Sequence, residues 1–544
     1  MYFGYEASSD APASGPAGAR AYWVTRDTLL WAIAVPDDYT YRLHYDLGAG
    51  IKLLPEGVTG GKQISLTRAR QGPAEAVWNK FPHLRGMAAL TIAADDQGQV
   101  AEALRGQIVV SAVDRDGRVV DATGLQIPGV LDDLYSYDGP LGVAFDGGAP
   151  VLRLWAPTAQ SVKLRVFDDS SPPGEGTSVD MEHDARTGVW SVEGPASWKG
   201  KYYLYEVEVF VRSTGRIERN LVTDPYSLSL STNSQRSQIV DLDDPALMPH
   251  GWQSLHKPTL DAPEDIVLYE LHVRDFSITD QTVAPENRGT FRAFTEQGSN
   301  GMRHLHGLAK AGLTHIHLLP VFDIATIEED RAARVEPDAI RLAELPPDSE
   351  EQQALIEPLR DKDGFNWGYD PYHFTVPEGS YATDPDGSAR IREFREMVMA
   401  LSEAGLRVVM DVVYNHTNAS GQSPKSVLDR IVPGYYHRLD AQGQVETSTC
   451  CQNTASEHAM MEKLMLDSLR TWATAYKVDG FRFDLMAHHM VANMVRARDL
   501  LARLTPEKDG VDGSKIYLYG EGWNFGEVAN NARGANATQP NMAG

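Results

Sequence analysis

The sequence predicts a multidomain protein in which N-terminal all-β domains, expected to be β-sandwiches, precede an incomplete (β/α)8 TIM barrel. Its 544 residues exceed what one hydrophobic core usually holds. Short β-prone runs separated by Asp, Gly and Pro fill the N-terminal part of the chain. From Ile266 onward, apolar strands alternate with amphipathic helices, which is typical of a parallel sheet with crossover helices.

Composition and pattern divide the chain into five segments. Residues 1–21 are rich in small residues and proline and are expected to be a linker. Residues 22–135 contain β-prone runs such as TLLWAIAV and GQIVVSAV. Residues 136–240 contain VLRLWAPTAQSVKLRVFD, where apolar and polar residues alternate with the period of half-buried strands. A second linker, 241–264, precedes the predicted barrel at 265–544.

Strands one to five of the barrel are predicted, and no more. The expected strands are residues 266–273, 314–321, 406–413, 478–485 and 515–522. Helices are predicted between the last three strands from apolar residues at three-and-four spacing, which are Met461, Leu464, Met465, Leu469, Trp472 and Tyr476, then Met494, Ala497, Leu501 and Leu504. The acidic stretch 328–363 is expected to be a solvated helical insertion. Because a complete barrel needs eight strands, the chain is expected to be C-terminally truncated.

Charge limits the classes of partner. Fifty Lys and Arg against 75 Asp and Glu give a formal charge of −25, which disfavours nucleic acid and anionic membranes and suits a neutral polymer. Neither a signal peptide nor a transmembrane stretch is predicted, and no compartment is assigned. The adjacent Cys450 and Cys451 are interpreted as two buried small hydrophobes in preference to a vicinal disulfide.

Polar and aromatic residues gather where the last three predicted strands end. These residues are Asp411, Asn415 and His416 after the third strand, Arg482, Asp484 and His488 after the fourth, and Glu521 and Trp523 after the fifth. Active sites of parallel α/β barrels lie at the carboxyl ends of their strands. The sequence therefore predicts an active site built from these residues.

Two of the carboxylates suit glycoside chemistry. Arg482 and Asp484 are two residues apart, so both are expected to point into the barrel, where the arginine would keep the carboxylate ionised. An ionised Asp484 could attack an anomeric carbon while a protonated Glu521 lies across the cleft. The alternative, a purely structural Arg482–Asp484 ion pair, is disfavoured because Glu521, His416 and His488 lie on the same strand ends.

The strings DVVYNH and GFRFD and the glutamate after the fifth strand resemble three signature regions of the α-amylase superfamily, glycoside hydrolase family thirteen, in the same order. The resemblance implies that Asp484 is the catalytic nucleophile and Glu521 the general acid/base. It also implies substrate-site roles for Asp411, His416, Arg482 and His488. Asn415 matches a calcium-binding residue of many α-amylases, but that role is not general among debranching enzymes, so calcium stays unassigned.

Three longer strings are similar to pullulanases and plant limit dextrinases, namely YELHVRDFS, NWGYDPYHFTVPEGSYAT and STCCQNTASEHAMMEKLMLDSLRTW. This likeness implies that Tyr369 is the aromatic platform under the sugar at the cleavage subsite and that Trp367 replaces a histidine of many α-amylases. Residues 136–240 resemble a family forty-eight carbohydrate-binding module. Trp155 and Trp190 of that region are interpreted as core residues more readily than as sugar platforms.

The expected function is a retaining glycosidase that cleaves α-1,6-glucosidic links in pullulan, amylopectin or limit dextrins, with an α-glucan as its partner and no cofactor required. An α-1,4-acting amylase or amylopullulanase remains an alternative. A non-catalytic glucan-binding protein is an alternative of another class. The superfamily's third catalytic carboxylate is not found after Glu521, so the 544-residue chain by itself is expected to be inactive.

Overall fold

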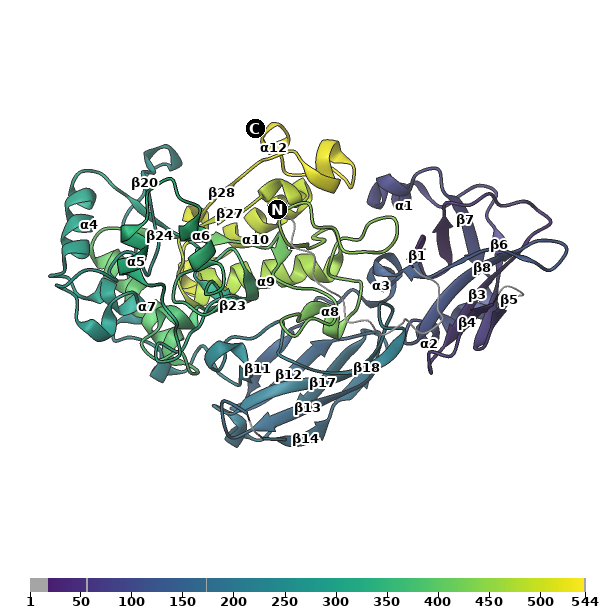
Figure 1. The fold of residues 1–544 in the computed structure, drawn as a ribbon, viewed down its shortest axis with the longest axis horizontal. Coiled ribbons are helices and arrows are strands. Elements are labelled where there is room, and N and C mark those ends of the chain that lie inside the picture. The colour runs from purple at the N-terminus through teal and green to yellow at the C-terminus, as the bar shows by residue number, and fades with distance from the viewer. Residues whose placement is uncertain (1–17, 55–56, 173, 543–544) are drawn as a thin grey trace.

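The computed structural model describes residues 18–54, 57–172 and 174–542. Figure 1 shows the N-terminal sheet in purple at one end, a β-sandwich below the middle, and a parallel sheet with its helices at the other end. Most of the predicted N-terminal linker lies outside the described residues. Its last part is packed, since Ala19 is buried and the first strand begins at Ala21.

The first domain is β-rich as predicted, but it has one eight-stranded sheet, with a small separate pair of strands, and not two packed sheets. In spatial order its strands are β10 (Leu125–Gln126), β1 (Ala21–Thr25), β2 (Thr28–Trp31), β7 (Ala88–Ile92), β6 (Lys62–Arg68), β3 (Thr40–Asp46), β8 (Gln107–Val113) and β9 (Val119–Thr123). Strands β9 and β10 stand at opposite ends of this order, although only Gly124 separates them in the chain. The sheet therefore curls round on itself until it is nearly closed.

The second domain is a β-sandwich, as the period-two pattern predicts. One sheet contains β11 (Gly142–Asp146), β12 (Ala149–Trp155), β16 (Val189–Glu193) and β15 (Glu182–Asp184). The other contains β14 (Thr177–Asp180), β13 (Ala159–Phe167), β17 (Tyr202–Val211) and β18 (Arg216–Val222), with β19 (Ser237–Gln238) paired to β17.

Trp155 and Trp190 are core residues of this sandwich, as expected. Trp155 is 2% exposed, donates its indole N–H to the Tyr135 carbonyl and lies 4.7 Å from the Tyr435 ring. Trp190 is 7% exposed and stacks on His183. Neither ring offers a free face on which a sugar could stack.

The segment 241–264 connects the sandwich to the parallel sheet and stays packed against the rest of the protein. Trp252 is buried in it, and the Lys257 ammonium lies 2.7 Å from Asp479 on the other side of the contact. The predicted second linker is therefore a packed connection between two domains.

A sheet of five parallel strands confirms the strand predictions from Ile266 onward. Its order is β20 (Leu268–Leu271), β21 (His315–Leu318), β24 (Arg407–Val412), β27 (Gly480–Phe483) and β28 (Tyr517–Gly520). The longer helices are α4 (Asn300–Lys310), α7 (Ala389–Glu403), α9 (Ala459–Ala475) and α10 (Val491–Ala502). Met461, Leu464, Met465, Leu469 and Trp472 are buried on α9, which confirms the predicted apolar stripe.

Burial is uneven across the parallel sheet. Every residue of the central strand β24 is buried. On the edge strand β20, Leu268 and Tyr269 are each 39% exposed, and Val267 just before it is 51% exposed. The edge strand β20 therefore exposes apolar side chains to solvent, whereas the side chains of the central strand β24 are buried.

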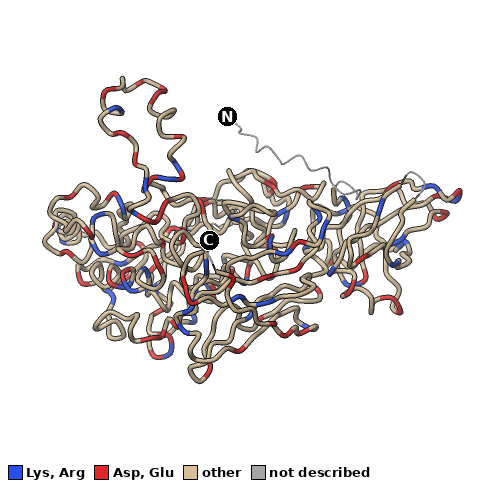
Figure 2. Tube along the Cα trace, turned by 60° about the horizontal axis from the view of Figure 1, so that its bottom comes forward, with Lys and Arg blue, Asp and Glu red and all other residues tan. Residues whose placement is uncertain are grey.

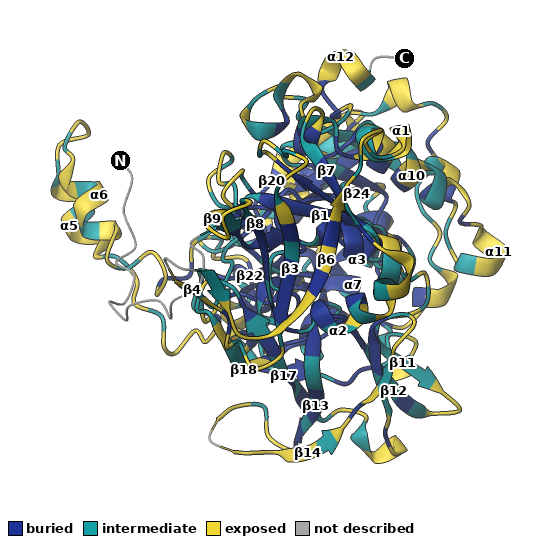
Figure 3. Ribbon diagram, turned by 90° about the vertical axis from the view of Figure 1, so that its right-hand side faces the viewer, coloured by how far each residue is buried: buried dark blue, intermediate teal, exposed yellow. Residues whose placement is uncertain are grey.

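The insertion predicted at 328–363 contains α5 (Ala339–Glu344) and α6 (Glu351–Ile356), and Figure 3 shows both helices projecting away from the rest of the protein. Most of their residues are exposed, as expected, but Glu329 and Asp363 at the base of the insertion are buried. At its base, two strands pair antiparallel, β22 (Phe322–Ile324) and β23 (Pro371–Pro377).

The remaining elements are short. They are β4 (Lys52–Leu54), β5 (Gly57–Thr59), β25 (His416–Thr417), β26 (Gln452–Asn453), α1 (Glu75–Lys80), α2 (Val100–Ala103), α3 (Pro128–Tyr135), α8 (Leu428–Ile431), α11 (Pro506–Asp509) and α12 (Gln539–Met542). Figure 2 shows acidic residues spread over all parts of the described chain. Among the described residues, no helix is both long and apolar enough to cross a bilayer.

Candidate active site

One arginine contacts three carboxylates at the carboxyl end of the parallel sheet. Arg482 Nη1 donates to both oxygens of Asp411, at 3.0 and 2.9 Å, and to Asp484 Oδ1 at 3.2 Å. Its Nη2 lies 2.5 Å from Glu521 Oε1. We call Arg482, Asp411, Asp484 and Glu521 the Arg482 cluster; it unites four of the predicted site residues.

Strand register explains why these residues meet. In the parallel ladder, Asp411 on β24 pairs with Arg482 on β27, and Arg482 pairs with Tyr519 on β28. Asp484 lies two residues after Arg482, and Glu521 lies two residues after Tyr519, so both point to the same face of the sheet as those paired residues. The chain turns immediately afterwards.

Burial governs the protonation of Asp484 more strongly than its arginine does. Burial raises the pKa of Asp484 to about 6, and the nearby Asp411 and Glu521 add to that rise, whereas Asn415 and Arg482 lower it. The sequence-based expectation that the arginine alone would keep this carboxylate ionised is therefore incomplete. Arg482 makes its shorter Nη1 contacts with Asp411.

Tyr369, His416 and Asn415 surround the cluster as the sequence predicts. The Tyr369 hydroxyl donates to Asp411 Oδ2 at 2.9 Å, and its carbonyl lies 2.8 Å from His416 Nε2. Asn415 Nδ2 donates to the carbonyl oxygen and to Oδ2 of Asp484, both at 2.9 Å, while its Oδ1 lies 2.7 Å from His416 Nδ1. Asn415 thus positions the carboxylate and the histidine together.

The remaining predicted residues differ in exposure. His488 is 1% exposed, neither of its ring nitrogens has a hydrogen-bond partner among the described residues, and burial lowers its pKa to about 4. Its ring packs edge-on against Phe525. Trp367 and Trp523 are 62% and 61% exposed, so both indoles are accessible to a large ligand.

Sequence reasoning missed His317. His317 Nε2 lies 3.5 Å from Asp411 Oδ2, so a fourth strand, β21, also reaches the Arg482 cluster. The signal was present, because the run THIHLLPV places polar His315 and His317 two residues apart on a strand.

The interpretation of Cys450 and Cys451 as buried hydrophobes is wrong. Cys450 is exposed and Cys451 half-buried, and the two form a disulfide between adjacent residues. Sulfur atoms of both and a ring nitrogen of His416 lie within 4.8 Å of one another. The STCC string therefore borders the site; adjacent cysteines gave no clue to that proximity.

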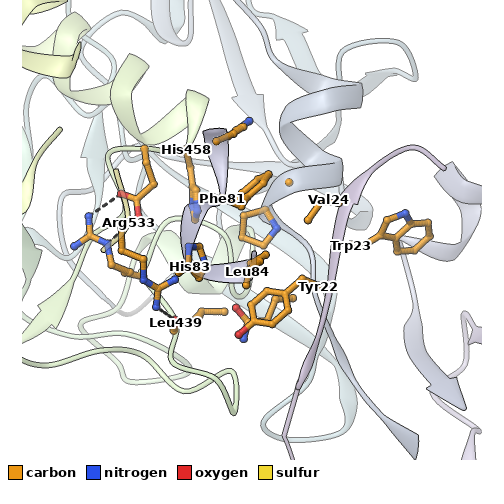
Figure 4. A pocket seen from close by; sticks show the side chains of 15 residues that line it. Tyr22, Trp23, Val24, Phe81, His83, Leu84, Leu439, His458 and Arg533 are labelled. Atoms are coloured by element: carbon orange, nitrogen blue, oxygen red, sulfur yellow. Dashed lines mark hydrogen bonds and ion pairs between the residues drawn. The ribbon is translucent and has the colours of Figure 1, made fainter. Parts of the chain in front are cut away.

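Two cavities lie away from the Arg482 cluster. Figure 4 shows a pocket between the first domain and the part of the chain that carries the parallel sheet, with His83, Phe81 and Arg533 in its wall. Its volume of about 40 Å³ holds little more than a water molecule. A cavity of about 610 Å³ lies where all three domains meet, lined among others by Gln107 and Arg212. Neither includes a member of the Arg482 cluster, and the chemistry of the carboxylates identifies the candidate site better than cavity size.

Comparison with known proteins relates nearly the whole chain to pullulanases. Residues 18–133 match the Pullulanase N2 domain, and residues 140–227 match Carbohydrate-binding module 48 (Isoamylase N-terminal domain). The chain is 47% identical over 531 residues to Pullulanase 1, chloroplastic, of Arabidopsis thaliana, which covers 97% of this chain and 54% of that protein. It is 40% identical over 568 residues to a pullulanase of Klebsiella pneumoniae, covering 95% of this chain and 50% of that protein.

Solved structures agree with the sequence relatives. The maltotriose complex of PulA from Klebsiella pneumoniae superposes with a TM-score of 0.90 at 39% identity, covering 97% of this chain and 60% of that one. PulA from Klebsiella oxytoca gives 0.88 at 39% identity, covering 97% and 52%.

Two β-rich domains followed by a parallel sheet whose carboxyl end carries a carboxylate cluster define a modular protein with an α/β C-terminal part. The chain has the Pullulanase N2 and Carbohydrate-binding module 48 domains and is similar to pullulanases over nearly all of its length. It spans about half the length of the two relatives named above.

Proposed function

We propose that the protein is a retaining glycosidase that cleaves α-1,6-glucosidic links in pullulan and related branched glucans. The observation that carries the proposal is the contact of one guanidinium, Arg482, with three carboxylates at the carboxyl end of the sheet. Glycoside cleavage with retention needs two carboxyl groups, one nucleophilic and one able to exchange a proton. Pullulanase relatives that match most of this chain support the linkage.

In the first step, ionised Asp484 attacks the anomeric carbon while protonated Glu521 gives its proton to the leaving glycosidic oxygen. Asn415 and Arg482 hold the two Asp484 oxygens in place through separate donors. A carboxylate fixed in this way loses little entropy when it reacts.

In the second step, Glu521 takes a proton from water, which attacks the glycosyl–Asp484 ester and releases a product of retained configuration. Glu521 is suited to both steps because its side chain is 33% exposed, so it can exchange protons with solvent. Asp484, at 13%, is better shielded and suits the covalent intermediate.

The remaining site residues bind the sugar. Tyr369 is the platform below the ring, since its hydroxyl is tethered to Asp411 and its orientation is thereby fixed. His416 and His488 lie at the cleavage subsite in this proposal, and neither ring nitrogen of the buried His488 has a hydrogen-bond partner among the described residues. The exposed Trp367 and Trp523 stack on further glucose units.

The parallel strands are part of a (β/α)8 barrel in this proposal. The exposed apolar residues of β20 support it, because a closed barrel covers both edges of such a sheet.

The test is hydrolysis by the full-length protein of pullulan and amylose, followed by reducing-end assay. Release from pullulan with little release from amylose supports the proposal. Equal release from both would indicate an amylase or amylopullulanase. Retention of glucan without any hydrolysis would indicate a binding protein.

A further inference from the structure

A buried glutamate in the segment after β28 lies beside the candidate active site but takes no part in the proposed reaction. Glu527 belongs to a short 3-10 helical segment, Gly526–Asn531, that follows Glu521 and Trp523 in the chain. Its side chain is 7% exposed. A carboxylate buried to this degree needs hydrogen-bond partners, and those partners indicate what it does.

Both oxygens of Glu527 accept hydrogen bonds from one other segment of the chain. Its Oε1 accepts from Arg438 Nη1 at 2.9 Å and from Asn453 Nδ2 at 3.0 Å. Its Oε2 accepts from the Ser448 hydroxyl at 2.5 Å and from Asn453 Nδ2 at 3.2 Å. Burial alone would raise the pKa of Glu527, but Arg438 and Ser448 lower it to about 2, so the carboxylate is ionised at neutral pH. Glu527 therefore fastens the segment after β28 to residues 438–453.

The first connection leads to His416. Asn453 is the last residue of β26, which pairs antiparallel with β25, and in that register Asn453 lies opposite His416. The next residue, Thr454, donates its backbone N–H to the Asn415 carbonyl at 3.0 Å. Because Glu527 holds the buried side chain of Asn453, it also holds the strand that pairs with His416.

The second connection leads to His488. Neither of its ring nitrogens has a hydrogen-bond partner among the described residues, so packing and the backbone hold this imidazole. Arg438, a partner of Glu527, donates from Nη2 to the His488 carbonyl at 3.0 Å. The His488 ring packs against Phe525 with the ring centroids 4.8 Å apart, and a Cβ atom on Gly526 would lie 3.1 Å from His488 Cε1. The segment that carries Glu527 is therefore in close contact with this imidazole.

Balancing the charge of Arg438 does not explain Glu527. Glu457 already accepts from Arg438 Nε at 2.8 Å and from Nη2 at 2.6 Å, through both of its carboxylate oxygens. Such a two-point contact offsets the guanidinium charge. A second carboxylate on the same guanidinium adds an excess negative charge, which is costly to bury. This cost indicates that Glu527 is needed for its contacts with Ser448 and Asn453.

We propose that Glu527 is a positioning residue that holds His416 and His488 at the cleavage subsite. This role rests on the proposed function, in which both histidines bind the sugar there. One ionised carboxylate fixes both imidazoles, the first through β26 and the second through Arg438. Precise placement of sugar-binding groups matters for the rate, because the reacting atoms must be held in line for attack.

The experiment compares the full-length wild type with Glu527→Gln and with Glu457→Gln, each assayed well below its Tm. Both substitutions replace one carboxylate on Arg438 by a nearly isosteric amide. Glu457 is a matched control, because its side chain binds Arg438 and not Ser448 or Asn453. We expect Glu527→Gln to lower kcat/KM on pullulan by about 10- to 100-fold and Glu457→Gln to lower it by less than about threefold. An equal loss in both variants would overturn the proposal, because it would trace the effect to Arg438.

A second substrate separates the histidines from the acid/base. α-Maltotriosyl fluoride releases fluoride, which leaves with little need for a proton, so its hydrolysis depends less on Glu521. We expect Glu527→Gln to lose as much activity on this fluoride as on pullulan. A loss confined to pullulan would show that Glu527 positions Glu521 instead, and it would overturn the assignment to the histidines.

Crystal structures of the wild type and of Glu527→Gln give a readout that does not depend on activity. We expect the imidazoles of His416 and His488 to be displaced in the variant. Unchanged positions of both imidazoles would overturn the proposal. A wild type that hydrolyses no glucan would contradict the proposed function, and the imidazole positions would still decide whether Glu527 holds the two histidines.

Discussion

The Arg482 cluster has the same composition, three carboxylates and one arginine, as a second group formed by Asp323, Glu329, Glu378 and Arg390, which we call the Arg390 cluster. The two clusters differ in access to solvent. In the Arg482 cluster the side chains of Glu521 and Asp484 are 33% and 13% exposed. In the Arg390 cluster no side chain exceeds 2%. An open cluster can exchange protons and meet a substrate. In a sealed cluster, the negative charges must be offset by positive charges or protons inside the protein.

The arginines also hold their partners differently. Arg482 lies 2.5 to 3.2 Å from each of its three carboxylates, whereas Arg390 lies 3.2 and 3.7 Å from two of its own. The comparison teaches that composition alone does not assign a role. Exposure and contact distance separate an open cluster suited to chemistry from a sealed one within the protein core.

The largest expected difference is in catalysis. Asp484→Asn and Glu521→Gln should each lower kcat/KM on pullulan by about 10³-fold or more, or about 4 kcal/mol of transition-state stabilisation, because each removes one carboxyl group that reacts. Glu329→Gln, the same chemical change in the Arg390 cluster, should leave kcat/KM within about threefold at 25 °C. Near-normal hydrolysis by Glu521→Gln would show that the acid/base role is wrongly assigned.

Stability should change in opposite directions within the Arg482 cluster. The folded-state pKa of Asp484 is raised from 3.8 to about 6, so the folded protein binds the proton more tightly and stability falls as pH rises through this window. At pH 8 Asp484→Asn should therefore stabilise the protein by at most about 3 kcal/mol, at about 1.4 kcal/mol for each pH unit.

Asp411→Asn should instead destabilise the protein by about 3 kcal/mol, because it removes the buried negative charge that faces Arg482 and replaces one of the two oxygens that accept from Nη1 by an amide nitrogen, which cannot accept. Calorimetric unfolding at pH 8 compares both variants with wild type. A change of the same sign in the free energy of unfolding of both variants would contradict this prediction.

The pH dependence of kcat/KM tests the role of Asp484 in the Arg482 cluster. Because the nucleophile must be ionised, kcat/KM should fall about tenfold for each pH unit below about pH 6. Asn415→Ala removes a donor that favours ionised Asp484, so its acidic limb should move to higher pH. An unchanged limb in this variant would assign the titration to another group.

The smallest effects are expected at the exposed aromatic residues. Trp367→Ala and Trp523→Ala should change stability by less than about 0.5 kcal/mol, since both indoles are mostly exposed. Each should raise KM for pullulan by roughly fivefold, or about 1 kcal/mol of lost stacking, with little change in kcat. A fall in kcat alone would place the tryptophan in the chemistry and not in glucan binding.

Local sequence pattern was enough to predict the five strands, α9 and α10, because apolar spacing reports strand and helix directly. It also predicted that Arg482 and Asp484 share a face, since strand geometry fixes that relation. The nearly closed sheet of the first domain was not predictable, because its strand order depends on contacts between distant segments such as β10 and β1.

Burial was the other quantity that sequence could not supply. The pKa of Asp484 depends on the packing around it. Glu329 was expected to be solvated with its neighbours in the insertion, yet it is 2% exposed because the base of that insertion is folded against α7 and the segment after the sandwich. The position of a residue within an acidic stretch of sequence therefore does not predict how deeply its side chain is buried.

The central claim is that the Arg482 cluster cleaves α-1,6 links with retention. Its most direct test is proton NMR of pullulan hydrolysis by the full-length wild-type protein, recorded before the new reducing end mutarotates. The account predicts that the α-anomer is released first and the β-anomer grows in afterwards. Initial release of the β-anomer would contradict it.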